Sequence, residues 1–243
     1  NFSDKFIELF FTPFFAGIFL EKDLQTSSKF FKYVFSNFSN GLACLPSEGM
    51  QKIPDLIFKN ISSDRLLLNQ SLERIEDNGL LIFNNGQTIK GNNIVLTGGS
   101  HKKIGLNKVS YNSVRNIYFE SDIKIENGKY IHLFPKDSTI NNVAVLNQVS
   151  HNYSKSNSLL SISVIGHELK DKLDIKQFKR RLANYFGGND SNYEWVKSFD
   201  IKNATIKQNT NFFDSNTFSP SKGLIIAGDH SVYGSIEGAV LSG

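Results

Sequence analysis

The closing stretch of the chain, GLIIAGDHSVYGSIEGAVLSG (residues 223–243), constrains the fold more than any other segment. Leu224–Ala227 is a run of four apolar residues without a polar face, which predicts a central strand of a parallel sheet. Gly228 and Asp229 follow this strand, and after a short loop Ser235 precedes a predicted helix of mostly small residues. Because ligands of open α/β sheets collect at the carboxyl ends of strands, Asp229 is a candidate ligand contact.

Two interpretations of this segment stay open from its residues alone. The helix repeats small residues four positions apart, Gly238 with Ser242 and Ala239 with Gly243, which lets a neighbouring backbone or a flat cofactor approach closely. The positive end of its dipole, near Ser235, favours an anion or a partial negative charge. The same pattern also fits an ordinary strand–turn–helix, in which an aspartate caps a helix or forms a turn.

The spacing of apolar residues elsewhere predicts further helices. TSSKFFKYVFSNFSNG (residues 26–41) and DKLDIKQFKRRLANYFGG (residues 171–188) carry apolar residues at helical spacing, and glycine ends each pattern. A third helix is expected after Gly49, with Pro54 in its first turn. The phenylalanine-rich segment at residues 11–20 is interrupted by proline and glycine, and we expect it to form a strand or a loop.

Short apolar segments predict strands from residue 66 to 97 and again from about residue 100 to 166. Asn78-Gly79 and Asn85-Gly86 predict two hairpins with type I′ turns, because Asn and Gly tolerate positive φ angles. The apolar run at residues 94–97 predicts a strand that is buried on both faces. The fold class that follows is a mixed α/β or α+β protein.

Composition narrows the possible functions. The chain has 243 residues, of which 40% are hydrophobic and 21% charged, as expected for a globular protein with a core. The net charge is +4, but the lysines are scattered and only residues 179–181 form a basic cluster, so we expect no nucleic-acid binding. The single cysteine, Cys44, excludes a disulfide within the chain and fits a cytoplasmic, intracellular protein.

Other site classes find no support in the sequence. The five histidines lack the spacing of metal ligands, so we expect no metal site and surface or loop positions for His101, His132, His151, His167 and His230. The sequence contains neither a Gly-x-Ser-x-Gly elbow nor a Cys–His pairing, so it does not indicate a hydrolase. No catalytic residue is singled out, and the oligomeric state is left undefined.

The ends of the chain and its hydropathy lead to two further expectations. No apolar run approaches the roughly 18–20 residues of a membrane-spanning helix, so we expect no transmembrane segment, while peripheral contact with a membrane stays open. The chain begins without methionine or a signal peptide and stops inside a helical pattern. We therefore expect it to be an interior piece of a longer protein.

The closing stretch resembles the C-terminal FAD-binding signature of the flavin-containing amine oxidase superfamily, which includes monoamine oxidases, protoporphyrinogen oxidases and phytoene-desaturase-like enzymes. The shared pattern is an apolar strand, Gly-Asp or Gly-Glu, a spacer and Glu-Gly-Ala-x-x-Ser-Gly. Other segments resemble the family in order and spacing: PFFAGIFL…TSSKFF, LPSEGMQKIPDLI and LERIEDNG…FNNGQTIKGNNIVLTGG.

The resemblance implies FAD as the cofactor, held by a partial Rossmann-like domain. Asp229 would lie near the ribityl chain and pyrophosphate, and Gly228 would permit close approach. The backbone N–H of Ile236 would face the pyrimidine edge of the isoalloxazine, while Glu237 and Gly238 would begin the helix beneath it.

The resemblance also implies a division into domains. Residues 49–100 and 211–243 would form the partial FAD-binding domain, and residues 1–48 and 101–210 would form a substrate domain of mixed sheet and helices. Leu72 would contact the adenine through its backbone. The implied activity is hydride transfer from a small-molecule substrate to the flavin.

Two departures from the family pattern shape these expectations. The Gly-x-Gly-x-x-Gly unit that holds the pyrophosphate in the family does not occur here, so we expect this chain alone to hold FAD weakly or not at all. Amine-oxidising members carry an aromatic residue where this chain has Ser235, with Tyr233 two residues earlier. This favours dehydrogenation or desaturation of an apolar substrate; the alternatives are an amine-oxidising member and a non-catalytic binding or scaffold module.

Overall fold

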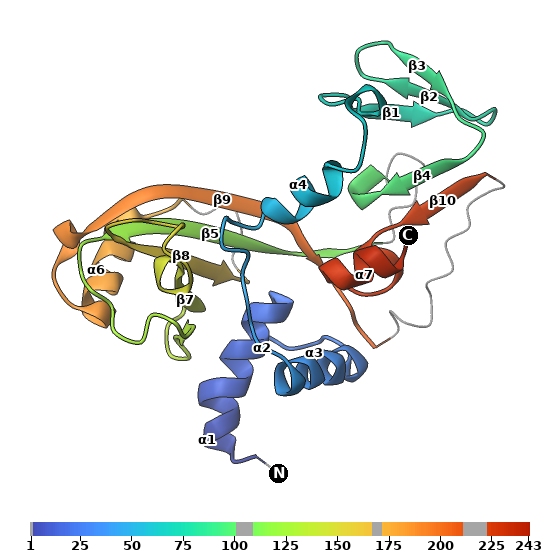
Figure 1. The fold of residues 1–243 in the computed structure, drawn as a ribbon. Coiled ribbons are helices and arrows are strands. Elements are labelled where there is room, and N and C mark those ends of the chain that lie inside the picture. Colours follow the sequence, from blue (N-terminus) through green and yellow to red (C-terminus); the bar gives the residue numbers. More distant parts are fainter. Residues whose placement is uncertain (1, 101–108, 167–171, 211–222) are drawn as a thin grey trace. The chain divides into compact units, whose positions relative to one another are not determined.

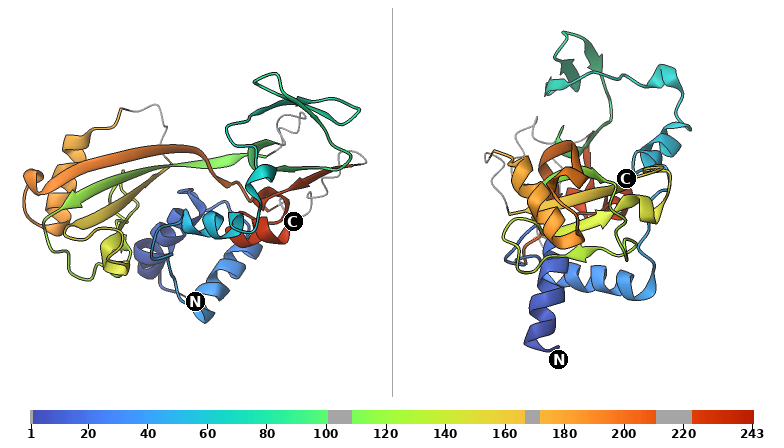
Figure 2. Two further views of the ribbon diagram at one scale, coloured as in Figure 1. Left: turned by 45° about the horizontal axis from the view of Figure 1, so that its top comes forward. Right: turned by 90° about the vertical axis from the view of Figure 1, so that its left-hand side faces the viewer.

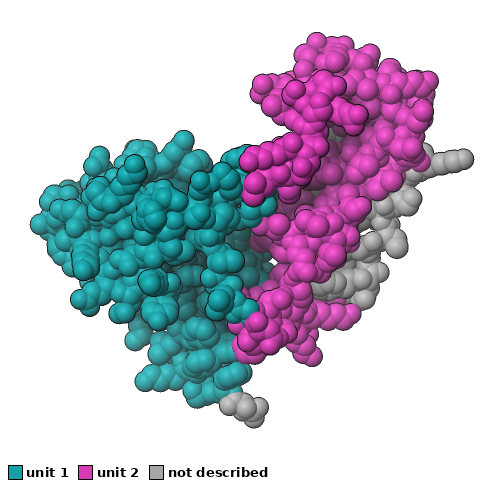
Figure 3. All heavy atoms as spheres, viewed as in Figure 1, with its two compact units in different colours: residues 1–24, 41–55, 112–204 teal, residues 25–40, 56–111, 205–243 magenta. Residues whose placement is uncertain are grey.

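The structure is a computed structural model that describes residues 2–100, 109–166, 172–210 and 223–243. Contacts within the chain divide it into two compact units, coloured separately in Figure 3. Unit 1 contains residues 1–24, 41–55 and 112–204, and unit 2 contains residues 25–40, 56–111 and 205–243. Each unit is therefore assembled from separate stretches of sequence.

The predicted substrate and FAD-binding domains are likewise discontinuous, and their assignment to these two roles stays a prediction. Residues 25–40, which the prediction grouped with the substrate side, lie in unit 2. His101, His167 and the parts of the predicted ranges at residues 101–108 and 211–222 lie outside the described residues.

Unit 1 is built on a five-stranded sheet. Its strand order is β6-β7-β8-β5-β9, and the β6–β7, β7–β8 and β8–β5 pairs are antiparallel. Figure 2 shows the long strands β5 and β9 running side by side. The strands are β5 (Tyr111–Ser121), β6 (His132–Leu133), β7 (Asn142–Val145), β8 (Ser158–Ile165) and β9 (Tyr193–Ile206), with the short helices α5 (Leu146–Val149) and η4 (Asp190–Asn192) between them.

The core of unit 1 lies between this sheet and helix α6 (Ile175–Phe186). Alternation along β5 and β8 points every second side chain into the core, which also contains Phe178 and Leu182 of the helix. The carboxylate of Asp174 caps α6 by accepting a hydrogen bond from the N–H of its third residue, and Gly187, with φ of 93°, ends it. The helix predicted within residues 171–188 is confirmed.

The N-terminal segment of unit 1 is helical, so the strand or loop expected at residues 11–20 is wrong. Helix α1 (Asp4–Phe6), the π-helix η1 (Ile7–Phe11) and helix α2 (Thr12–Phe19) follow one another without a break (Figure 1). Pro13 is the second residue of α2, and the turn before it is the wider π-helix η1, which accommodates the proline within the continuous helical segment. Gly17 allows close packing, because a Cβ there would lie 2.5 Å from the Asn141 side-chain oxygen.

Unit 2 combines helices with two small sheets. Helix α3 (Ser28–Asn40) confirms the helix predicted after Thr26. Helix α4 (Lys52–Phe58) confirms the helix predicted after Gly49, and the last residues of α4 belong to unit 2. A three-stranded antiparallel sheet follows, of β1 (Leu72–Ile75), β2 (Leu80–Phe83) and β3 (Thr88–Lys90). The other elements are η2 (Ser63–Arg65), β4 (Ile94–Thr97), β10 (Leu224–Ala227), η6 (Asp229–Ser231) and α7 (Ile236–Leu241).

The two hairpins of the three-stranded sheet form where the Asn-Gly pairs predict them, but not with type I′ turns. Only the glycines have positive φ, 79° at Gly79 and 81° at Gly86. Each turn is longer than two residues, so one left-handed residue is enough to return the chain. The side-chain oxygens of Asn78 and Asn85 instead accept hydrogen bonds from the backbone N–H two residues later.

Strand β10 pairs with β4 in parallel, as its apolar run predicts. Burial on both faces is wrong: Leu96 and Ile226 are buried, but Val95 is 56% exposed and Ile225 53% exposed. In the part of the chain that the structure describes, this sheet has only these two strands. Alternate side chains therefore point to a face that the described residues do not cover.

Candidate functional site

The C-terminal strand, loop and helix of unit 2 form one continuous structure (Figure 1). Gly228 directly follows strand β10, and its φ of 149° is unfavourable for residues with a side chain. A Cβ at this position would lie 2.7 Å from the ring of His230. The Gly228 N–H donates a hydrogen bond of 2.7 Å to the hydroxyl of Ser242. The end of the strand is thus tied to the end of α7.

Ser235 starts helix α7 as its N-cap. Its hydroxyl accepts a hydrogen bond of 2.9 Å from the N–H of Gly238. A Cβ at Gly238 would lie 2.1 Å from the carbonyl oxygen of Tyr233, so only glycine fits this approach of helix to loop. The N–H groups of Ile236 and Glu237 have no acceptor among the described residues. Two backbone donors at the start of α7 are therefore available to another group.

Helix α3 supports α7 from a distant part of the sequence. The hydroxyl of Tyr33 donates a hydrogen bond to the carboxylate of Glu237, across 204 residues of chain. The rings of Tyr33 and Tyr233 lie 4.7 Å apart, and Phe30 packs against both. This aromatic cluster holds the loop before α7 in place.

Gln208 joins the same loop to the start of α3. Its side chain is buried, and its side-chain oxygen accepts a hydrogen bond of 3.0 Å from the Gly234 N–H. Its carbonyl oxygen accepts another, of 2.7 Å, from the N–H of Ser27. Gln208 therefore satisfies one backbone donor with its buried side chain and a second with its own carbonyl group, which fixes the path of the loop.

Asp229 follows the strand with a side chain that is 35% exposed. Burial raises the pKa of Tyr111, and the negative charge of Asp229 raises it further, which places the phenol within the field of this carboxylate. His230, expected in a surface or loop position, does lie in a loop helix but is only 1% exposed. Its ring is buried because Gly228 has no side chain to displace it.

The segment also presents apolar surface. Ile236 is 57% exposed, Val240 68% and Leu241 62%, while Gly238 between them is buried. Val95 and Ile225 of the parallel strand pair are exposed as well. The segment therefore combines the partly exposed carboxylate of Asp229, two available backbone donors and exposed apolar side chains.

The structure brings six of the seven predicted binding residues together in this segment: Gly228, Asp229, Ser235, Ile236, Glu237 and Gly238. The seventh, Leu72, lies on β1, opposite Phe83 in the separate three-stranded sheet, and its role stays a prediction. Four residues that contact or surround the segment were not predicted from the sequence: Tyr33, Tyr111, Gln208 and Ser242, the last through its hydroxyl group. Ser242 was interpreted only as a small residue, and the others carry no local signal.

The family model for flavin-containing amine oxidoreductases matches the chain from residue 1 to residue 243. The chain belongs to this family. No curated protein is matched, but solved structures share the fold.

Reduced UDP-galactopyranose mutase is similar with a TM-score of 0.68 and 13% identity over 95% of this chain and 61% of that one. An oxidoreductase from Methanosarcina mazei is similar with a TM-score of 0.72 and 15% identity over 99% of this chain and 64% of that one. The mixed α/β fold with several sheets and helices is therefore that of known oxidoreductases. This chain spans less than two thirds of the length of either structure.

No group of three or more His, Cys, Asp or Glu residues in the described ranges could hold a metal ion. No helix within these ranges combines the length and the apolar character needed to cross a membrane.

Proposed function

We propose that this protein is an FAD-dependent oxidoreductase that removes hydride from a small, mainly apolar organic substrate. Family membership over the whole chain carries this proposal, because the family is defined by its flavin. The C-terminal segment, whose residues resemble the family's FAD signature, supplies the binding groups. The lone cysteine supports an intracellular location.

The residues present fit a flavin dinucleotide. The partly exposed carboxylate of Asp229 can accept hydrogen bonds from hydroxyl groups of the ribityl chain. The free N–H of Ile236 can donate to the pyrimidine edge of the ring system, and the carboxylate of Glu237 accepts a hydrogen bond from the Tyr33 hydroxyl. Exposed apolar side chains on α7 and the strand pair suit a flat, largely apolar ring.

Bound FAD supplies hydride acceptance, and the protein contributes position and electrostatics. Gly228 keeps the strand end free of a side chain, so that Asp229 meets the ligand directly. Ser235 and Gly238 fix the first turn of α7, which keeps the Ile236 N–H at a constant position. A fixed donor favours negative charge that develops beside it during reaction.

The surroundings of Ser235 favour dehydrogenation or desaturation of an apolar substrate over amine oxidation. The Ser235 hydroxyl is used in capping α7 and offers no aromatic wall. The nearby ring of Tyr233 is packed against Phe30 and Tyr33. Neither residue therefore supplies the aromatic wall that amine-oxidising relatives place here.

Flavin retention tests the proposal. In the complete translated protein, Asp229→Ala is expected to lower the flavin retained after gel filtration about tenfold, since a hydrogen bond to a charged group contributes about 1.5–3 kcal/mol. Asp77→Ala removes an exposed carboxylate from a turn of the same unit and serves as the control. Equal retention by both variants and the wild type contradicts the role of Asp229.

Bleaching of the flavin band on anaerobic addition of apolar substrates separates an enzyme from a scaffold. We expect loss of the visible absorbance band of oxidised flavin, because transfer of hydride from the substrate would reduce the cofactor. A protein that retains flavin but is not bleached by apolar compounds or amines would be a non-catalytic relative.

A further inference from the structure

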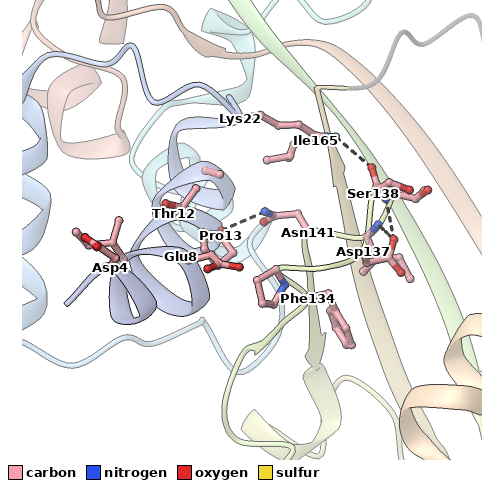
Figure 4. Close-up of a pocket in the computed structure, with 15 residues that line it drawn as sticks. Asp4, Glu8, Thr12, Pro13, Lys22, Phe134, Asp137, Ser138, Asn141 and Ile165 are labelled. Carbon is pink, nitrogen blue, oxygen red and sulfur yellow. Dashed lines mark hydrogen bonds between the residues drawn. The ribbon is translucent and has the colours of Figure 1, made fainter. Parts of the chain in front are cut away.

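Unit 1 contains a hollow of about 530 Å³ between its N-terminal helical segment and the residues around β6 and β7 (Figure 4). This volume lies within the range of small-molecule sites in proteins. Its walls are partly apolar, formed by Pro13, Ala16, Phe134, Ile140 and Ile165. The hollow lies within one unit and shares no residue with the C-terminal segment described above.

Opposite charges line two sides of this hollow. Asp4 and Glu8 project from the helical segment one turn apart, and neither forms an ion pair with another described residue. Lys22 reaches the other side, where its ammonium group donates a hydrogen bond of 3.1 Å to the carbonyl oxygen of Ser138 (Figure 4). Like charges one helical turn apart repel, so a cation beside the two carboxylates would be stabilised.

The wall opposite the helix is held in a defined shape by Asp137. Its side chain is 1% exposed and accepts hydrogen bonds from the N–H groups of Thr139 and Ile140, from the Tyr185 hydroxyl and from Arg181. Burial alone would raise the pKa of Asp137, but these hydrogen bonds outweigh it and lower the pKa. The charge of Asp137 is thus matched by Arg181 and does not add to the acidic side.

The helical wall is also specialised. Pro13 has no N–H, and its ring would meet the carbonyl group four residues earlier in a regular helix. The preceding turn widens into the π-helix Ile7–Phe11, with the Thr12 N–H bonded to the carbonyl oxygen of Ile7. Asn141 fixes the widened turn by donating a hydrogen bond of 3.1 Å to the Pro13 carbonyl oxygen. Such π-turns are frequent at functional sites.

We propose that this hollow binds an elongated zwitterion, such as an ω-amino carboxylic acid. Its ammonium group lies beside Asp4 and Glu8, its carboxylate meets Lys22, and its methylene chain covers the apolar wall. The site is separate from the proposed flavin function and does not depend on it. The two rigid walls support binding because they require little reorganisation when the ligand enters.

Isothermal titration calorimetry of the whole chain with compounds of one chain length tests the ligand class. We expect ε-aminocaproate to bind about fivefold more tightly than hexylamine, hexanoate or hexamethylenediamine, since a partly exposed ion pair contributes up to about 1 kcal/mol. Binding should weaken as salt is raised. Equal or tighter binding of any of the other three compounds overturns the proposal, as does the absence of binding by all four.

Charge-neutralising variants locate the site. Asp4→Asn combined with Glu8→Gln, and Lys22→Gln alone, are each expected to weaken binding of ε-aminocaproate about fivefold. Glu126→Gln and Lys129→Gln remove exposed charges of the same unit outside the hollow and should bind like the wild type.

Wild-type affinity in both hollow variants overturns the location. All four variants change exposed side chains, and circular dichroism verifies that each is folded. Flavin content measured on the same samples is expected to stay constant, so this proposal and the flavin proposal can fail separately.

Discussion

The sheet of unit 1 and the β4–β10 pair of unit 2 are made of similar apolar residues but are stabilised differently. In β8 of unit 1, Leu160 and Ile162 are fully buried against the other strands and α6. In the strand pair, Val95 and Ile225 are more than half exposed. The first region is held by its core, whereas the second is fixed by hydrogen bonds and by close backbone contacts at glycine.

This difference suits the two regions to different tasks. The packed core of unit 1 tolerates little change in side-chain volume, and it places few polar groups at the surface. The C-terminal segment leaves a carboxylate, backbone donors and apolar side chains accessible, as a binding surface requires. Its shape depends on close contacts at Gly238 and on hydrogen bonds of Ser235 and Gln208, together with the small aromatic cluster around Tyr233.

The largest expected effect contrasts the two sheets directly. Leu160→Ala removes a fully buried side chain and should lower the free energy of unfolding by about 2–5 kcal/mol. Ile225→Ala, at a position that is 53% exposed, should lower it by less than about 1 kcal/mol. Urea denaturation of both variants measures the difference. Similar losses at the two positions would show that the strand pair is also buried in solution.

A smaller effect on stability, but a clear one on binding, is expected from Gly238→Ala. The new Cβ would meet a backbone carbonyl oxygen at 2.1 Å, so α7 must shift at a cost of about 1–3 kcal/mol. Flavin retention is expected to fall about tenfold.

Gly243→Ala is the matched control for this change. Its Cβ would approach its nearest neighbour, the Val240 carbonyl oxygen, at an ordinary 3.8 Å. If the two glycine variants retain the same amount of flavin, the position of α7 is unimportant for flavin binding.

The smallest effect is expected from Tyr33→Phe, which deletes one hydrogen bond to Glu237 while keeping the ring in its cluster. Stability should fall by about 0.5–1.5 kcal/mol, and flavin retention should fall severalfold as α7 becomes less well positioned. Tyr153→Phe deletes a comparable hydrogen bond of 2.7 Å in unit 1. Tyr153→Phe should change thermal stability without changing flavin retention. If both variants lose the same amount of flavin, Tyr33→Phe acts only through the stability of the protein.

Local patterns predicted much of the fold. Helix α6 was found because the apolar spacing and the terminal glycines agree, and the structure adds Asp174 as its N-cap. The prediction for residues 11–20 was wrong because proline and glycine were taken as interruptions, whereas a π-turn accommodates Pro13 within the helical segment and Gly17 packs against Asn141 and Asn142. The exposure of Val95 and Ile225 depends on how many strands join the sheet, which an apolar run of four residues does not encode.

The candidate site divides in the same way. Six predicted residues lie within eleven consecutive positions, so they are close in space because they are close in sequence. The Tyr33–Glu237 and Gln208–Gly234 contacts join segments that are distant in sequence or separated by a loop. Such contacts result from the tertiary fold, and no spacing rule predicts them.

The flavin content of the complete translated protein is the most direct test of the central claim. After incubation with FAD and removal of free cofactor, absorbance should show close to one flavin per chain in the wild type, and clearly less in Asp229→Ala. A wild-type protein that is folded by circular dichroism and retains no flavin would contradict the claim that the C-terminal segment binds this cofactor.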